Sequence, residues 1–363
     1  MRVRLEDVCE KESSKLKQSD VINQNGLYPV YGASGYLGNI NTYQQSNYYV
    51  AVVKDGAGIG RTMLLPPKSS IIGTMQYLIP KDNVQPEYLY YVVKAKHLEK
   101  YFSGATIPHI YFKDYKNEQF DLVSFEEQRD IINRLKKIEI IIDNLSKNLL
   151  LLDELVKARF VEMFGDENNS KNWDVVNVEE VADVQVGVVI KPSQYYTDKS
   201  EGVRTFRSLN IGAGFIKDND WVYFTKEGHQ KNSKSILKKD DLLIVRSGAP
   251  GTACVVTEEY AGCNAVDIII AHPDCKKVNP YYLCTFTNMP HGKKQIDEGI
   301  GGAAQQHFNV GKYNKLQLML PPKTLQDEFV GFVKQVDKSK VEIQKSLEKT
   351  QQLYDSLMQK YFG

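Results

Sequence analysis

The sequence predicts an α+β fold in which two similar sheet-containing domains with pseudo-two-fold symmetry are separated by two long helices, which form an intramolecular antiparallel coiled coil. Residues 103–165 align without a gap on residues 301–363, at a constant offset of 198 (363 − 165). Each copy ends in a long stretch with heptad periodicity, and each follows a region rich in short β-type runs. Two such units in one chain predict two similar surfaces.

The repeat is specific at the level of single residues. His109 aligns with His307, Gln128 aligns with Gln326, and both copies close on Phe-Gly, at 164–165 and 362–363. A register of this length indicates an internal duplication, and two similar halves in one chain favour a pseudo-symmetric arrangement.

Residues 1–125 predict the first sheet-containing domain. Apolar and aromatic runs at 47–53, 62–65 and 75–79 are typical of strands, and glycine, asparagine and aspartate separate them. Residues 86–101 follow as a short helical run.

Residues 126–165 predict the first long helix. Ser124 and Glu127 form a capping-box pattern, and Gly165 suits the left-handed position that ends a helix. The apolar residues between them recur at alternating spacings of four and three, as in a coiled coil. They are Ile131, Leu135, Ile138, Ile142, Leu145, Leu149, Leu152 and Val156.

Residues 166–322 predict the second domain, and residues 323–363 predict the second long helix. The domain has β-type runs at 203–209, 221–225, 241–246, 253–257 and 266–270. The helix carries the same seam, at Phe329, Val333, Val336, Lys340, Ile343, Leu347, Thr350 and Tyr354. An antiparallel pair within the molecule buries both stripes; packing of each helix on its own domain, or a homodimer, is the alternative.

Composition excludes several classes of protein. The chain has 363 residues with 42% hydrophobic and 25% charged residues, which is typical of globular proteins, and a net charge of +1, which argues against nonspecific electrostatic binding of nucleic acid. Charges interrupt every long apolar stretch, so we expect no membrane span or secretion signal, and a cytoplasmic location.

The five cysteines do not favour a metal site. Four of them fall within residues 254–284, but their spacings match no common zinc pattern, so reduced thiols in strands are the better interpretation. We predict no cofactor.

Residues 55–60 contain a G-x-G-x-G pattern after a predicted strand, which raises the alternative of a self-contained DNA methyltransferase. However, Arg61 opens another β-type run instead of a helix, and the second half has Ser247-Gly-Ala-Pro-Gly in the same place. A duplicated hairpin turn explains both copies better than a nucleotide or methyl-donor loop. We identify no catalytic residues.

Polar and aromatic residues on the predicted turns remain as candidates. Arginine and lysine can bond to guanine edges, and asparagine and glutamine to adenine edges, so the set, repeated in two domains, favours DNA reading. The candidates are Tyr31, Ser34, Tyr36, Lys54, Arg61, His109 and Lys113 in the first half, and Arg204, Arg207, Asn210, Lys231, Arg246, Gln305, Gln306, His307 and Lys312 in the second.

With these features the chain resembles the specificity subunit of a Type I restriction–modification system. The resemblance rests on the order of several phrases: Tyr28 to Gly35 and Phe125-Glu-Glu-Gln128 in the first half, and Arg207-Ser-Leu-Asn, Asp241 to Gly248, Gly301 to Gln305 and Leu320-Pro-Pro with Gln326 in the second.

The resemblance implies a non-catalytic protein with two target-recognition domains, each reading one half of an asymmetric bipartite site in double-stranded DNA. It implies that the helices set the spacer and bind two methyltransferase subunits, with restriction and translocase subunits as further partners. A coiled-coil interaction protein without sequence specificity is the remaining alternative.

Overall fold

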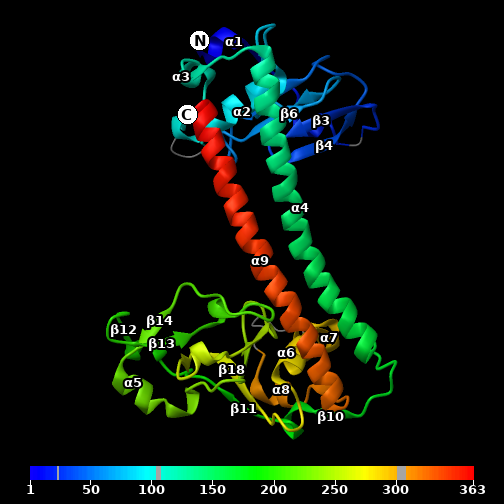
Figure 1. Ribbon diagram of the computed structural model, residues 1–363, viewed down its shortest axis with the longest axis vertical. Coiled ribbons are helices and arrows are strands. Elements are labelled where there is room, and N and C mark those ends of the chain that lie inside the picture. Colours follow the sequence, from blue (N-terminus) through cyan, green and yellow to red (C-terminus); the bar gives the residue numbers. More distant parts are fainter. Residues whose placement is uncertain (23, 104–107, 301–307) are drawn as a thin grey trace. The chain divides into compact units, whose positions relative to one another are not determined.

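The computed structural model describes residues 1–22, 24–103, 108–300 and 308–363 (Figure 1). They form two compact units, the first made of residues 1–148 and 343–363 and the second of residues 149–342. Each unit therefore combines one globular region with parts of two long helices.

The first unit is built on a four-stranded antiparallel sheet in the order β2-β8-β5-β6, with strands β2 (Cys9–Ser13), β8 (Met75–Pro80), β5 (Tyr49–Val53) and β6 (Thr62–Leu65). A second sheet has the order β4-β3-β7, with β3 parallel to β7. The remaining elements are β3 (Tyr28–Gly32), β4 (Gly35–Ile40), β7 (Ser70–Ile71), the pair β1 (Arg2–Arg4) and β9 (Gln119–Asp121), the helices α1 (Leu5–Val8), α2 (Pro86–Ala95) and α3 (Phe112–Tyr115), and the 3₁₀ turns η1 (Gln18–Asp20) and η2 (Leu98–Tyr101).

The second unit repeats this plan. Its antiparallel sheet has the equivalent order β11-β18-β15-β16, and in its smaller sheet β13 lies parallel to β17. The strands are β10 (Val175–Asn177), β11 (Ala182–Val186), β12 (Tyr196–Thr197), β13 (Val203–Phe206), β14 (Val222–Phe224), β15 (Leu242–Val245), β16 (Ala253–Val255), β17 (Asn264–Ala265), β18 (Ile268–Pro273) and β19 (Gln317–Met319). The helices are α5 (Lys226–Lys231), α6 (Pro280–Asn288), α7 (Pro290–Ile300) and α8 (Val310–Asn314), with 3₁₀ turns η3 (Val178–Glu180), η4 (Pro192–Tyr195), η5 (Ser208–Asn210), η6 (Ser233–Ser235) and η7 (Glu258–Tyr260).

A buried central strand explains why each main sheet has an apolar cluster on both of its faces. Successive side chains of a strand point to opposite faces of the sheet. In β5, Val50 and Val52 join one cluster, whereas Ala51 and Val53 join the other. In β15 the same alternation divides Leu242 and Ile244 from Leu243 and Val245. Continuous apolar runs in the sequence thus become strands covered on both faces.

The same polar contacts occur in both units, with acceptor residues 198 positions apart (326 − 128) and donor residues 194 positions apart (282 − 88). The Gln128 carboxamide oxygen accepts from the backbone N–H of the residue before α2 at 2.8 Å, and Gln326 does the same before α6 at 2.8 Å. Tyr88 donates to the Asp121 carbonyl at 3.0 Å, and Tyr282 donates to the Met319 carbonyl at 2.8 Å. The duplication is therefore one of hydrogen-bonded frame as well as of sequence.

The two long helices begin and end close to the predicted bounds: α4 spans Phe125–Phe164 and α9 spans Lys323–Phe362. Glu127 N–H donates to the Ser124 hydroxyl at 3.3 Å, Ser124 N–H donates to the Glu127 carboxylate at 3.2 Å, and Gly165 has φ +90°. At about 1.5 Å per residue, the 40 residues of each helix span about 60 Å. Every predicted seam residue of both helices is buried or partly buried.

Within each unit the helices pack in opposite directions. In the first unit Tyr354, near the end of α9, donates to Glu139, in the first half of α4, at 2.7 Å. In the second unit Arg159, near the end of α4, pairs with Glu328, at the start of α9, at 3.2 Å. The predicted α+β fold with an intramolecular antiparallel helix pair is thereby confirmed.

The last aromatic residue of each helix lies in a core. In the first unit Phe362 packs edge-on against Tyr88, with ring centroids 5.3 Å apart. In the second unit Phe164 packs in the same way against Tyr282, with centroids 4.8 Å apart. The repeated Phe-Gly ending of the sequence is therefore a core contact followed by a helix stop.

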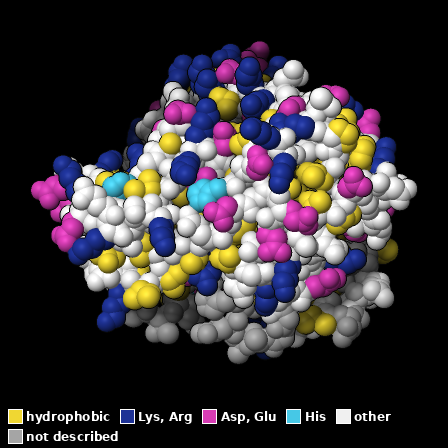
Figure 2. Space-filling model, turned by 90° about the horizontal axis from the view of Figure 1, so that it is seen from below, with side chains coloured by type: hydrophobic (Ala, Val, Ile, Leu, Met, Phe, Trp, Pro, Cys, Tyr) yellow, Lys and Arg dark blue, Asp and Glu magenta, His cyan; other side chains and the backbone are white. Residues whose placement is uncertain are grey.

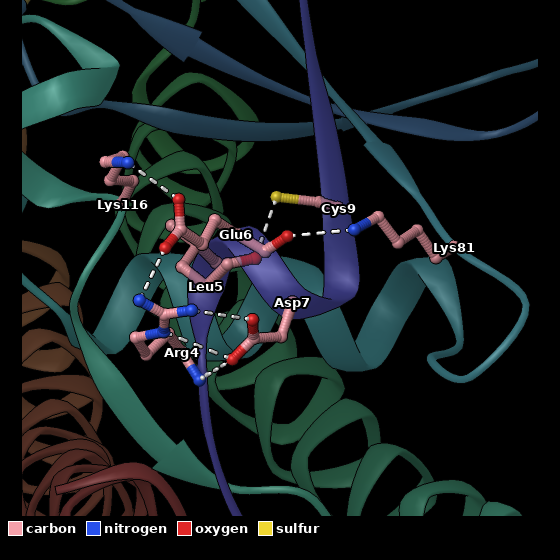
Figure 3. Close-up of polar contacts among 7 residues, drawn as sticks. All are labelled: Arg4, Leu5, Glu6, Asp7, Cys9, Lys81 and Lys116. Atoms are coloured by element: carbon pink, nitrogen blue, oxygen red, sulfur yellow. Dashed lines mark hydrogen bonds and ion pairs between the residues drawn. The ribbon is translucent and has the colours of Figure 1, made fainter.

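The first strand of the first unit is fixed by a small polar cluster around α1 (Figure 3). Arg4 pairs with Glu6 at 2.8 Å and with Asp7 at 3.3 Å, and Lys116 pairs with Glu6 at 2.8 Å. Lys81 donates to the Glu6 carbonyl at 2.9 Å. These contacts join the strand pair β1–β9 to the edge of the main sheet.

One predicted element differs from the structure. The expected helical run over residues 86–101 is interrupted, because α2 ends at Ala95 and His97 has φ +49° before η2 begins. A left-handed residue breaks the hydrogen-bond ladder of a helix. As for membrane spans, the described ranges contain no helix that is both long and apolar enough to cross a bilayer.

Candidate nucleic-acid interface

Three loops of the first unit converge beside the main sheet. They are the turn between β3 and β4, the hairpin loop at 54–61 and the segment around His109. The Arg61 guanidinium donates to the Ala33 carbonyl at 2.8 Å, and Gly56 N–H donates to the Pro108 carbonyl at 3.0 Å. Sequence reasoning placed candidates on each loop, and these bonds bring the loops together.

The β3–β4 turn presents aromatic side chains. Tyr31 and Tyr36 contact each other edge-on with centroids 6.2 Å apart, and the side chain of Tyr36 is 61% exposed. Ser34 lies exposed at the turn between them, and the Tyr36 hydroxyl donates to Asn39 at 3.1 Å. An exposed tyrosine held by a side-chain hydrogen bond suits contact with a base or sugar.

Cations surround the second part of this cluster. The Lys54 ammonium is half-buried, and this burial, with the nearby Lys11, lowers the pKa of Lys54. His109 contacts the Asp55 carboxylate, and burial followed by the Lys54 charge lowers the pKa of His109. Lys113 lies over the Tyr111 ring at 5.0 Å. A desolvated cation gains from an incoming phosphate, because the phosphate replaces lost hydration.

The hairpin loop at 54–61 is a turn between antiparallel strands. Gly60 N–H donates to the Val53 carbonyl at 2.9 Å, and in the second unit Gly251 N–H donates to the Val245 carbonyl at 2.9 Å. No helix follows either loop. The prediction of a duplicated hairpin is confirmed, and the geometry of a dinucleotide loop, in which a helix begins at the last glycine, is not present at these residues.

The equivalent position of the second unit has a different chemistry. Arg246 stands where the first unit has Lys54, and its side chain is 17% exposed. Its guanidinium pairs with Asp267 at 2.5 Å and donates to the Phe308 carbonyl at 3.3 Å, and Phe308 N–H donates back to the Arg246 carbonyl at 2.9 Å. Arg246 therefore holds the base of the loop with two of the five N–H donors of its guanidinium.

Three further candidates of the second unit also have internal partners. The Arg204 guanidinium lies over the Trp221 ring at 5.1 Å and over the Tyr260 ring at 5.5 Å. Asn210 is fully buried and accepts from Arg207 N–H at 2.9 Å. Arg207 donates to the Asp220 carbonyl. These contacts favour support of the loops over direct contact with bases.

The other candidates differ in what the structure says of them. Lys231 is exposed and pairs with Glu227 at 2.8 Å, and Lys312 is exposed on α8. Gln305, Gln306 and His307 lie outside the described residues. Sequence reasoning missed Asp55, Asp267 and Tyr111, which contact the candidates; proximity of Asp55 and Asp267 to the strand ends was the available signal.

Charges do not form a single-sign field. Figure 2 shows cationic and anionic side chains interspersed on the face that it presents, as expected from a net charge of +1. In the part of the chain that the structure describes, no three His, Cys, Asp or Glu side chains are grouped so as to hold a metal ion. The loop clusters therefore offer donors, rings and cations for binding.

The fold contains two similar units, and each unit carries a cluster of loops on the same framework. This arrangement defines the class of proteins with two tandem recognition domains. The family model for the Type I restriction modification DNA specificity domain matches residues 1–151 and 170–353. The chain belongs to this family. As a member it carries the DNA specificity domain of Type I restriction–modification systems.

Two curated relatives come from Methanocaldococcus jannaschii. The specificity subunit of the Type I restriction enzyme MjaVIII is 26% identical over 211 residues, which are 54% of this chain and 49% of the relative. The specificity subunit of MjaIX is 21% identical over 308 residues, which are 78% of this chain and 69% of the relative. The chain thus spans about half the length of the first of these relatives and about two thirds of the second.

Solved structures share the fold. The S subunit of a Type I restriction–modification system from M. genitalium has a TM-score of 0.62 at 16% identity, covering 100% of this chain and 96% of that one. A chain from a study of complex assembly and conformational transition of the Type I system also has a TM-score of 0.62, at 15% identity, covering 100% and 97%. At these identities the likeness concerns the fold alone.

Proposed function

We propose that residues 1–125 and 166–322 are target-recognition domains, that each reads one half of an asymmetric bipartite site in double-stranded DNA, and that helices 126–165 and 323–363 set the spacer. The main observation in support is the repeated frame with unlike loops. One cluster has the exposed Tyr36 and the half-buried Lys54, whereas Arg246, at the Lys54 position of the other unit, is internally bonded. Unlike loops on one frame fit unlike half-sites.

The helices would also bind two methyltransferase subunits, with restriction and translocase subunits joining the complex. Exposed apolar residues on α4 support this part of the proposal. Leu151 and Leu155 are both exposed, and because they are four residues apart on α4 they lie on one face of the helix. Exposed apolar stripes of this kind bind partner helices.

The function is tested by expressing the chain with its methyltransferase subunits and sequencing methylated adenines in the genome, with and without this gene. We expect one asymmetric bipartite motif that disappears with the gene. Methyl transfer by the purified chain alone would contradict the proposal. Equal binding of the complex to random duplexes would favour the coiled-coil interaction protein instead.

The spacer role is tested by inserting one heptad after Leu145 and one after Leu347. Seven residues add about 10 Å at 1.5 Å per residue, or about three base pairs at 3.4 Å each, and keep the seam in register. We expect a longer spacer between unchanged half-sites. An altered half-site sequence would argue against this division of roles.

The docking role is tested with the double substitution Leu151→Asp and Leu155→Asp, which should abolish co-purification of the methyltransferase. Lys157→Asp is the matched control, because it changes the charge of α4 by the same amount at another exposed position. Loss of the partner in both proteins would point to charge alone.

A further inference from the structure

The second unit has an insertion, α5 with η6, for which the first unit has no counterpart. Residues 225–241 connect β14 to β15 and contain α5 and η6, whereas the equivalent connection from β4 to β5, residues 41–48, contains no helix or strand. Residues 187–195, which leave β11 and include η4, pack against this insertion. We call residues 187–195 and 225–235 together the apolar-tipped arm.

The arm is tied internally by backbone and side-chain contacts. Thr225 N–H donates to the Tyr195 carbonyl at 2.8 Å, and the Gln185 carboxamide donates to the Lys234 carbonyl at 2.6 Å. At Gly228 an added Cβ would lie 2.7 Å from the Tyr195 side chain, so α5 approaches η4 closely. The arm therefore has a defined shape.

The base of the arm lies beside the loop that Arg246 holds. Val188 N–H donates to the Ala265 carbonyl at 2.8 Å, and Asp267 N–H donates to the Val188 carbonyl at 3.1 Å. Asp267 is the residue that pairs with Arg246. The tip of the arm thus begins one residue after Val188, which is bonded to the backbone of Asp267 in the candidate interface.

The tip itself is apolar and exposed. Val189 is 48% exposed and Ile190 is 80% exposed, and neither belongs to an apolar cluster of the described residues. Lys191 follows at φ +43°, and Lys226, Lys231 and Lys234 are exposed on the packed helix and turn. The acidic residue of α5, Glu227, pairs with Lys231.

An exposed aliphatic tip next to Lys191, on an arm that also exposes Lys226 and Lys234, matches the chemistry of a DNA groove, where methyl groups and base edges lie between two rows of phosphates. We infer that Ile190 makes an apolar contact with the bases of the second half-site, while Lys226 and Lys234 bind the flanking phosphates. This inference rests on the proposed function. It adds Ile190 as a specificity-determining residue, whereas the candidates from the sequence are polar or aromatic.

The test uses the chain assembled with its methyltransferase subunits and duplexes carrying the site found by methylation sequencing. Ile190→Ala should lower the ratio of specific to nonspecific affinity about tenfold, the size of one lost base contact. Ile190→Leu should retain most of that ratio. Val175→Ala, at an exposed aliphatic residue of β10 in the same unit, is the matched control and should leave the ratio unchanged.

The lysines should act differently. Lys226→Gln with Lys234→Gln should weaken binding to specific and random duplexes alike, and should reduce the slope of log affinity against log salt by about 0.9 for each lost phosphate contact. If the wild-type complex selects its site and Ile190→Ala has the same ratio of specific to nonspecific affinity, the inference is overturned and the proposed function is not. A wild-type complex that selects no site would overturn the proposed function itself.

Discussion

The two units share a hydrogen-bonded frame and differ in the loops on it. Gln128 and Gln326 cap equivalent helices in the same way, yet the loop position that carries half-buried Lys54 in one unit carries ion-paired Arg246 in the other. The second unit adds β12 and α5, whereas the first presents Tyr36 on a tight turn. The comparison teaches that the frame tolerates new loops because its own contacts are buried.

The largest effect should come from the aromatic residue that ends each helix. Phe164→Ala and Phe362→Ala should each lower the free energy of unfolding by about 3–5 kcal/mol, because truncation leaves a cavity among packed rings. Chemical denaturation followed by circular dichroism measures it. Phe125→Ala, at an exposed residue of α4, is the control. A loss below about 1 kcal/mol at either site would show that the two units do not use this contact equally.

The buried glutamines should give the next largest effect. Gln128→Ala and Gln326→Ala each remove a fully buried carboxamide and leave a partly buried backbone N–H without its acceptor, at a cost of about 1–3 kcal/mol. Similar losses for the two variants would show that the frame is repeated in energy as well as in geometry. Gln335→Ala on the exposed face of α9 should change little, and the denaturation midpoints provide the measurement.

Substitution at the Lys54 and Arg246 positions should separate the two loop chemistries. Arg246→Ala removes an ion pair and a bond to the Phe308 carbonyl, and we expect it to destabilise the protein by about 1–2 kcal/mol. Lys54→Ala should leave stability within about 0.5 kcal/mol, because burial already lowers the pKa of this ammonium, and should weaken DNA binding instead. Thermal unfolding and a binding assay on the same two variants check this. The opposite assignment of effects would reverse the roles given to the two residues.

The smallest effect concerns acid sensitivity of the first unit. The hydrogen bond from Lys116 holds the pKa of Glu6 below its usual value. A carboxylate with a lowered pKa contributes stability above its unfolded pKa and loses it as the pH falls through the folded pKa. Lys116→Asn, which introduces the residue that the second unit has at this position, Asn314, should therefore reduce the difference in denaturation midpoint between pH 7 and pH 3. Lys15→Asn is the control, and an unchanged difference in Lys116→Asn would exclude this contribution.

Much of the fold could be predicted because its signals are local. The Ser124–Glu127 cap, the heptad seam and Gly165 set the bounds of α4 within one residue of those observed, and every seam residue is buried or partly buried. The candidate site was less predictable. Side-chain type suggested Asn210 and Arg246 as base readers. Yet the Asn210 side chain is buried and bonds to Arg207 N–H and to the Asn219 carbonyl, and Arg246 bonds to Asp267 and to the Phe308 carbonyl far along the chain.

The sequence alone determined the duplication, the two long helices and the positions of the main strands, because periodicity and caps are properties of neighbouring residues. Only the tertiary structure decided the strand order β2-β8-β5-β6, the parallel pairing of β3 with β7 and the burial of Phe362 beside Tyr88. These pairings join segments far apart in the chain, and their selection depends on which combination buries the most apolar surface while satisfying the backbone hydrogen bonds.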